Sequence, residues 1–208
     1  MNRNEIKQLI RRRDSLLDLY NKLDDDSNNV VNSSCTIDLS NNSRNSISNI
    51  IYNIDKQLLE YCKASHVGKW LLCIKGITPD TAAGLLAYFD VTGKDCSAQF
   101  IKYAGCDNCN NPHNNNLRAI MNKISDNFKS TSESLYGRLN EDKFIELLNG
   151  EDEITLQTAH LRADRYMRKV FISHLFEEMY REEHDGKLPE RYNDSYSIII
   201  EPEVPYTK

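Results

Sequence analysis

Residues that break helices are scarce in this sequence, and their scarcity constrains the fold more than any other feature. Only 8 glycines and 5 prolines occur among 208 residues, and the apolar residues mostly recur at spacings of three and four. Glycine and proline disfavour helix interiors, and a three-to-four spacing places apolar side chains on one helix face. The sequence therefore predicts an all-α fold.

Two amphipathic segments separated by a polar stretch open the chain. Residues 4–23 and 45–63 each carry an apolar stripe, and residues 24–44 between them are dense in Asp, Asn and Ser. Because such a composition is typical of a loop, we predict that residues 1–64 form a coiled-coil-like helical hairpin with a polar loop over 24–44. Either this hairpin packs on the rest of the chain, or it forms a homodimer.

The remaining apolar residues predict a second helical domain over residues 65–190. The segment 66–89 is compact and apolar and is interrupted once, around Gly76. Further helices are expected at residues 98–104, 117–128, 133–148 and 155–183. The tail, residues 191–208, contains two prolines and is expected to be an extended arm or a short strand.

Charge and hydropathy restrict the location and the partners of the chain. No apolar run approaches the roughly 20 residues that span a bilayer, and the first residues are charged, without the apolar stretch of a secretory signal. We therefore expect a protein of the cytoplasm, or of the compartment of the host cell that contains nucleic acid, with no membrane partner and with reduced cysteines. The net charge of −5 argues against indiscriminate coating of nucleic acid, although residues 159–175 hold four basic side chains against one acidic.

The turn between residues 74 and 81 resembles a helix-hairpin-helix motif. Gly76 permits a tight turn, Thr78 can cap the following helix, and Pro79 can begin it. The backbone N–H groups at such a helix start favour an anion, so the turn could hold a phosphate. The alternative is an ordinary helical hairpin with a capped turn. The candidate contacts are Lys69, Lys75, Gly76, Thr78 and Thr81.

A basic stripe on the last predicted helix is a second candidate for phosphate contacts. Arg162, Arg165 and Lys169 fall on one helix face, where they could follow a nucleic-acid backbone. The alternative is a solvated face that is balanced by the neighbouring acidic segments. His160 and His174 are predicted on the apolar side as core histidines, too far apart to share a metal ion, and Asp164 could pair with His160.

Cys106, Cys109 and His113 have the spacing C-x2-C-x3-H in a predicted loop. A closed zinc site needs four ligands, and the sequence offers no second pair of this kind to complete it. These three residues are therefore weak metal candidates, and ordinary loop thiols are the main alternative. We expect no cofactor.

Residues 66–190 resemble the C-terminal domain of the IS-one-ten transposases, an insertion-sequence family that includes the RNA-guided bridge recombinases. The matching runs are 74–83 (IKGITPDTAA) with 85–87 (LLA), 100–105 (FIKYAG), 116–118 (NLR), and the basic helix around Ala163 and residues 165–169. The resemblance implies a helix-hairpin-helix transposase domain that binds DNA or structured RNA. Lys102 and Arg118 lie in the matching runs and join the candidate contacts. The first two helices look like the coiled-coil segment that precedes this domain in the family.

The sequence also departs from the family at its catalytic residues. Family members carry a RuvC-like nuclease domain, to which nothing here corresponds, and a serine nucleophile shortly after the tyrosine-alanine-glycine turn. No serine occurs between Gly105 and Lys123. The leading interpretation is a nucleic-acid-binding protein without catalytic residues. The alternatives are a transposase that works with a separate nuclease or guide RNA, using another hydroxyl such as Ser125, Ser130 or Tyr136, and a structural or protein-interaction protein on the same fold.

Overall fold

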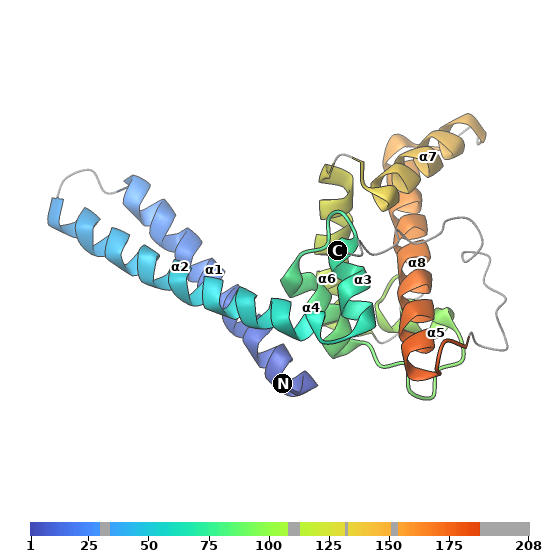
Figure 1. The fold of residues 1–208 in the computed structure, drawn as a ribbon. Helices are drawn as coiled ribbons and strands as arrows, with labels where there is room; N and C mark the ends of the chain where they lie inside the picture. The colour runs from blue at the N-terminus through green and yellow to red at the C-terminus, as the bar shows by residue number, and fades with distance from the viewer. Residues whose placement is uncertain (30–33, 108–112, 132, 151–153, 188–208) are drawn as a thin grey trace.

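The computed structural model describes residues 1–29, 34–107, 113–131, 133–150 and 154–187, with the side chains of 24–41 left out. The described ranges contain eight α-helices and no strand, so the prediction of an all-α fold is confirmed (Figure 1). The helices are α1 (Arg3–Asn29), α2 (Ser34–Lys63), α3 (His66–Cys73), α4 (Pro79–Tyr88), α5 (Ser97–Tyr103), α6 (Asn115–Ser130), α7 (Leu135–Gly150) and α8 (Leu156–Glu183).

The first two helices pair along their length, and their far end projects from the rest of the molecule as an arm (Figure 1). Both are longer than predicted, because α1 continues to Asn29 and α2 already begins at Ser34. The prediction of a polar loop over 24–44 is therefore wrong, and residues 30–33 lie outside the described part. Asp, Asn and Ser disfavour a helix by only a few tenths of a kcal/mol each, which the pairing of two long helices can offset.

The base of this arm is part of the core rather than a separate unit. Ile6 and Ile10 of α1 and Ile54 and Leu58 of α2 are buried, and both helices pack against α4. Packing on the body was one of the two predicted roles of the hairpin. The other role, a homodimer, stays a prediction.

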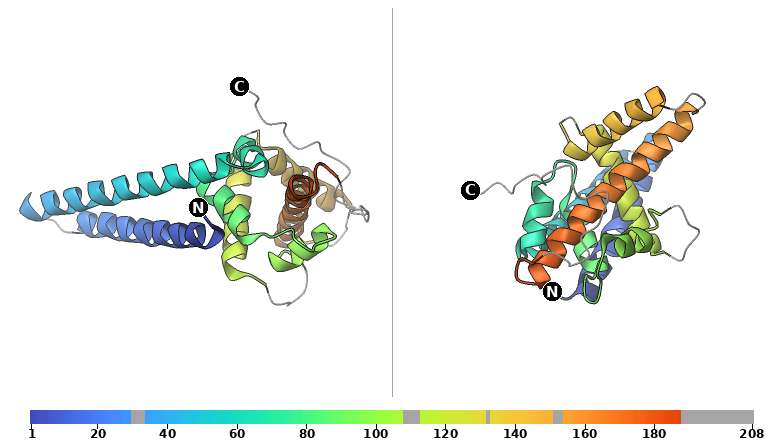
Figure 2. Two further views of the ribbon diagram at one scale, coloured as in Figure 1. Left: turned by 60° about the horizontal axis from the view of Figure 1, so that its bottom comes forward. Right: turned by 90° about the vertical axis from the view of Figure 1, so that its right-hand side faces the viewer.

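Helix α4 lies at the centre of the molecule. Each of its residues from Asp80 to Tyr88 is buried, and α1, α2, α3 and α6 surround it (Figure 2). Small side chains allow this close approach: a Cβ on Gly84 would lie 2.6 Å from Ile120 Cδ1. The long helix α8 covers the opposite side of the core and packs against α5, α6 and α7. As a result, α4 has little surface of its own to offer a partner.

The predicted helices of the second half are confirmed to within three residues at their ends, as α5, α6, α7 and α8. The predicted tail, residues 191–208, lies outside the described residues. Among the described helices, none combines the length and the apolar character that crossing a membrane would require.

Candidate nucleic-acid interface

The turn between α3 and α4 has the backbone geometry that the sequence predicts. Gly76 adopts a positive φ of 99°, and a Cβ there would lie 2.9 Å from Phe128 Cδ1. The Gly76 carbonyl accepts a hydrogen bond from Asn127 Nδ2 (3.1 Å). Thr78 is the N-cap of α4, and its N–H donates to Thr81 Oγ1 (3.0 Å), with Pro79 in the first turn. The turn is thus fixed by α6 on one side and by its own cap on the other.

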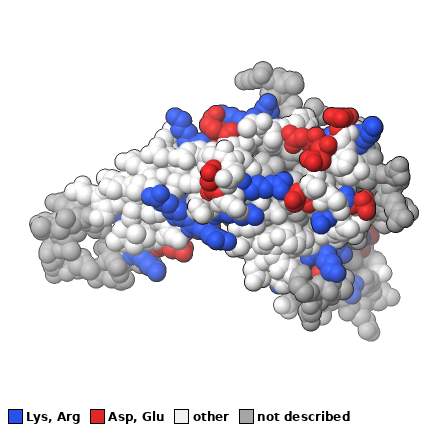
Figure 3. Space-filling model, turned by 90° about the horizontal axis from the view of Figure 1, so that it is seen from below, with Lys and Arg blue, Asp and Glu red and all other residues white. Residues whose placement is uncertain are grey.

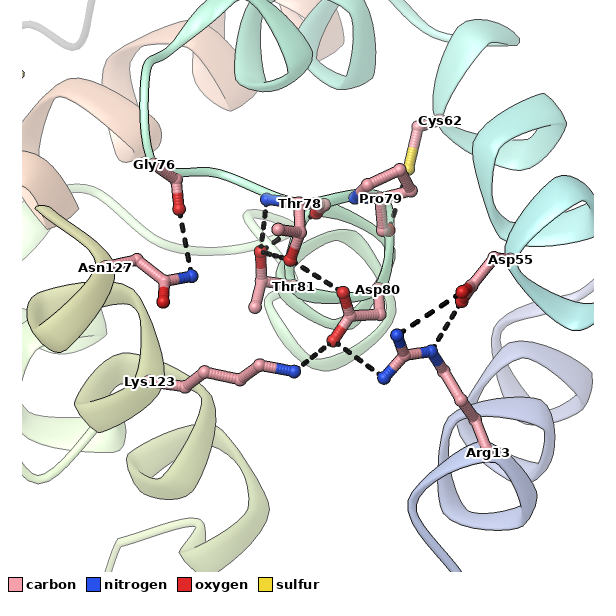
Figure 4. Close-up of polar contacts among 10 residues, drawn as sticks. All are labelled: Arg13, Asp55, Cys62, Gly76, Thr78, Pro79, Asp80, Thr81, Lys123 and Asn127. Carbon is pink, nitrogen blue, oxygen red and sulfur yellow. Dashed lines mark hydrogen bonds and ion pairs between the residues drawn. The ribbon is translucent and has the colours of Figure 1, made fainter. Parts of the chain in front are cut away.

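A carboxylate of the chain itself occupies the start of α4 (Figure 4). Asp80, in the first turn, is 7% exposed. Its Oδ1 accepts from Thr78 Oγ1 (2.6 Å), while its Oδ2 lies 2.5 Å from Lys123 Nζ and 3.5 Å from Arg13 Nη1. Arg13 in turn makes a two-pronged contact with Asp55 (2.5 and 3.3 Å). This ion-pair network joins α1, α2, α4 and α6.

The network keeps Asp80 ionised inside the protein. Burial raises the pKa of Asp80, but hydrogen bonds from Lys123 and Thr78 and the charges of Lys123 and Arg13 outweigh burial and hold the pKa below its ordinary value. A negative charge at a helix N-terminus is stabilised by the exposed N–H groups and the helix dipole. Asp80 is therefore an ionised carboxylate in the first turn of α4, held by Thr78, Lys123 and Arg13.

The predicted phosphate site on the hairpin consequently needs correction. Thr81 is 1% exposed, and its hydroxyl donates to the Thr78 carbonyl (2.9 Å), so Thr81 cannot reach a ligand outside, whereas Thr78 is half-buried and its hydroxyl donates to Asp80. Lys75 Nζ pairs with Glu133 Oε2 (2.8 Å) on the surface, and Gly76 uses its carbonyl internally. Lys69 remains as an exposed cation on α3. These contacts agree with the alternative interpretation, an ordinary capped hairpin, and phosphate binding at this turn stays a prediction.

Lys102 and Arg118 are brought to neighbouring positions by the capping of α6. Asn114, the N-cap of α6, donates from its N–H to the Tyr103 carbonyl (2.9 Å) and from its side chain to Tyr103 Oη (2.8 Å). Lys102 precedes Tyr103, and Arg118 stands one turn into α6, where its Nη1 donates to His113 Nε2 (3.1 Å). Both cations are exposed. The end of α5 and the start of α6 thus form one basic surface.

A second contact extends this surface onto α8. Arg168 Nη1 donates to the side chain of Asn122 (2.5 Å), which lies one turn beyond Arg118 on α6. Arg165 and Lys169 flank Arg168 on α8, the former exposed and the latter half-buried. We call this surface the basic band; it comprises Lys102, Arg118, Arg165, Arg168 and Lys169. Four of these residues are predicted contact residues. The fifth, Arg168, belongs to the predicted basic helix but was not among the predicted contacts.

A half-buried carboxylate, Asp164, lies beside the band. Asp164 pairs with Arg168 Nη2 (2.6 Å) and Lys129 Nζ (3.4 Å) and accepts a hydrogen bond from Ser125. The expected pair between Asp164 and His160 is therefore wrong. Asp164 holds Arg168 in place and neutralises part of the charge, while Arg162, which is exposed, lies one turn before Arg165 on α8.

The two histidines differ in their environment. His174 is 2% exposed and is hydrogen-bonded to the hydroxyl of Tyr136 (2.9 Å), as expected of a core histidine. Burial lowers its pKa to about 4, so it is neutral at physiological pH. His160 is instead exposed and stacks on Phe144 (3.9 Å between ring centres), which corrects the prediction of a buried position.

The weak metal candidates and the candidate hydroxyls have structural roles where they are described. Burial raises the pKa of the Cys106 thiol to about 11, and the His113 ring packs against Gly105. Cys109 lies outside the described residues, and among the described ones no group of three or more His, Cys, Asp and Glu side chains could hold a metal ion. Ser125 and Tyr136 are buried, and Ser130 donates to the Asn127 carbonyl (3.1 Å).

A cleft of about 530 Å³ lies beside the basic band, between the end of α4 and α5. Lys94 and Lys102 stand at its edge with Tyr103, whereas Tyr88 and Phe100 form its wall. Lys7 of α1 lies over the Tyr88 ring (4.9 Å). Figure 3 views the molecule from below, where Lys and Arg side chains gather mainly over the base of the arm and occur in smaller groups on the body, with acidic residues between them. The cleft between α4 and α5 has no signature in the sequence, since its residues belong to no single motif.

Comparison with known proteins identifies no relative: no protein-family model matches the chain, and no curated protein matches it.

Proposed function

We propose that this protein binds nucleic acid through the basic band. The observation that carries the proposal is the pair of contacts Asn114–Tyr103 and Arg168–Asn122, which bring cations from α5, α6 and α8 onto one surface. Cations gathered in this way release counterions from a phosphate backbone and so supply affinity without reading sequence. The chain as a whole carries a net charge of −5, so the proposal depends on these local cations and not on overall charge.

Two of the arginines are held in position before any ligand arrives. Arg118 is hydrogen-bonded to His113, and Arg168 is held by Asn122 and Asp164. A side chain that is already ordered loses less rotamer entropy when it contacts a phosphate. An arginine fork also matches the geometry of phosphate oxygens. This order distinguishes the band from a set of solvated lysines.

The resemblance to the IS-one-ten transposases makes DNA the first ligand to test, with structured RNA second. We propose that the chain descends from such a domain, acts in the cytoplasm and has no nucleophile of its own. Ser125 supports this view, because its hydroxyl is buried and bonded to Asp164. The alternative, a transposase that acts with a separate nuclease or guide RNA, requires Ser125 or Tyr136 to become accessible, or else the use of Ser130, which is exposed.

Fluorescence anisotropy with a labelled duplex at several salt concentrations tests the proposal. We expect the logarithm of the observed binding constant to fall linearly with the logarithm of the salt concentration. The double variant Arg165→Glu/Lys169→Glu should bind at least about 10-fold more weakly, with a slope smaller by roughly 2, since each lost phosphate contact contributes about 0.9. Unchanged affinity in this variant, or binding indifferent to salt, refutes the proposal.

A matched control separates local contacts from net charge. Lys56→Glu/Lys63→Glu makes the same change in charge on α2, where both lysines are exposed. It should retain nearly all of the affinity. Equal losses in both double variants would show that overall charge, and not the band, determines binding.

A second candidate function is a protein contact through the arm. Leu19, Ile50 and Tyr52 are exposed on the paired helices α1 and α2, with Tyr52 at 70%. A homodimer could cover such apolar side chains. Sedimentation equilibrium of the wild type and of a Leu19→Glu/Tyr52→Glu variant tests this: we expect a dimer that the variant converts to a monomer, and a monomeric wild type contradicts it.

A further inference from the structure

The cleft between α4 and α5 has a rigid aromatic wall. Phe89 and Phe100 are stacked with 4.3 Å between ring centres, and Phe100 meets Phe176 of α8 edge-on at 5.1 Å. All three rings are buried, so the wall is fixed by the core. The cleft has a volume of about 530 Å³, which lies within the roughly 300–1,000 Å³ of typical small-molecule sites.

An exposed aromatic ring stands at the mouth of the cleft. Tyr103 is 43% exposed, although its hydroxyl is held by Asn114 Nδ2 (2.8 Å). The ring is therefore fixed in place while part of its surface faces solvent. Nucleobases stack on such rings in proteins that bind single strands, at about 1–3 kcal/mol per base. Tyr88 cannot serve in the same way, because it is 7% exposed and Lys7 covers its ring.

The polar groups around the ring suit a nucleotide. Lys94 and Lys102 place positive charge at the edge, and Gln99 offers both a donor and an acceptor for the edge of a base. Asp90 also lines the cleft, but it pairs with Arg3 (3.1 Å). The slight burial of Asp90 raises its pKa, and hydrogen bonds from Thr92 and Arg3 more than reverse this, so it remains an ionised and compensated group.

We propose that the α4–α5 cleft holds an unpaired nucleotide of a single strand whose backbone follows the basic band. This inference rests on the proposed function and names its ligand. Lys102 belongs to both the band and the cleft, so one strand can contact both. In a duplex the base faces are covered, and extracting one costs a few kcal/mol. A single strand offers its bases at lower cost, and the protein should therefore prefer single-stranded DNA or RNA to a duplex of the same length.

Two variants of one residue test the inference. Tyr103→Phe keeps the ring and removes the bond to Asn114, whereas Tyr103→Ala removes both. We expect Tyr103→Ala to bind a single-stranded oligonucleotide about 5- to 100-fold more weakly and a duplex less than about 2-fold more weakly, with Tyr103→Phe close to the wild type. Lys94→Gln, which leaves the hydrogen bonds to Asn114 intact, should also weaken the single strand more than the duplex.

A fluorescent base gives a direct readout of stacking. An oligonucleotide with 2-aminopurine at one position should lose fluorescence on binding the wild type and Tyr103→Phe but not Tyr103→Ala. Equal affinity of the wild type for single strand and duplex, or a Tyr103→Ala variant indistinguishable from the wild type, overturns the assignment of the cleft. If Arg165→Glu/Lys169→Glu still weakens binding in that case, the proposed function is supported and only the role of the cleft is refuted. If neither strand form binds, the proposed function itself fails.

Discussion

Removing the charge of Asp80 should destabilise the whole fold, because Asp80 links four helices. Asp80→Asn keeps the size of the side chain and can still accept from Thr78. It leaves Arg13, which is largely buried, without one of its two carboxylates, and it leaves Lys123 without its partner at 2.5 Å. Removing one partner of a buried ion pair costs about 3–5 kcal/mol, chiefly because an uncompensated charge stays behind.

Two features of the structure place the expected cost at the lower end of this range. Arg13 retains its two-pronged contact with Asp55, and the Lys123 side chain is 44% exposed, so its ammonium can be hydrated. We therefore expect a loss of about 3 kcal/mol in the free energy of unfolding. For a chain of this length that corresponds to about 6–12 °C in Tm.

Urea denaturation followed by circular dichroism measures this loss. Asp90→Asn is the matched control, because its pair with Arg3 is exposed on both sides and should cost less than about 1 kcal/mol. Since the pKa of Asp80 is depressed in the folded state, its contribution is complete above pH 4–5 and declines as the pH falls through the folded-state pKa. A loss below about 1 kcal/mol at pH 7 would refute the role of the network.

Three further predictions concern single residues. The pKa of His174 is about 4 in the folded state, against an ordinary 6.5, so between these pH values the unfolded chain binds more protons than the folded one. The free energy of unfolding should therefore fall by up to about 1.4 kcal/mol per pH unit as the pH drops from 6.5 to 4. His174→Leu should reduce this pH dependence, as measured by urea titrations. Gly76→Ala, which forces a Cβ into φ +99° and against Phe128, should cost at least about 1–2 kcal/mol in thermal melts. Cys106, buried and with a pKa of about 11, should resist alkylation at pH 8 until the protein is unfolded, as measured by mass spectrometry.

Helix positions could be predicted from the sequence because they depend on local patterns. The apolar spacing and the rare glycines located α5 to α8 within a few residues, and Gly76 marked its turn. The extent of α1 and α2 was underestimated, because the composition of residues 24–44 resembles a loop and the partner that supports each helix is the other helix. Tertiary support of this kind leaves no local signal.

The candidate interface was only partly predictable for the same reason. The spacing along α8 placed Arg165 and Lys169 on one face, and motif matches selected Lys102 and Arg118. That the four lie on one surface depends on the contacts of Asn114 and Asn122, two polar residues with no pattern of their own. The cleft beside Tyr103 combines the end of α4, a loop and α5, so no spacing in the sequence could reveal it.

Asp80 shows how one local pattern can support opposite functional conclusions. The run Thr78-Pro79-Asp80-Thr81 has a cap, a helix-starting proline and exposed N–H groups, all of which suit a phosphate. The same positive helix end also stabilises a carboxylate in its first turn, and Asp80 is that carboxylate. Which anion occupies the site is decided by burial: four helices surround α4, so an external phosphate would have to lose its water and displace an ion pair already formed with Lys123. The hairpin therefore joins the arm to the body, and the contacts that we propose for nucleic acid lie outside it, on the basic band and in the α4–α5 cleft.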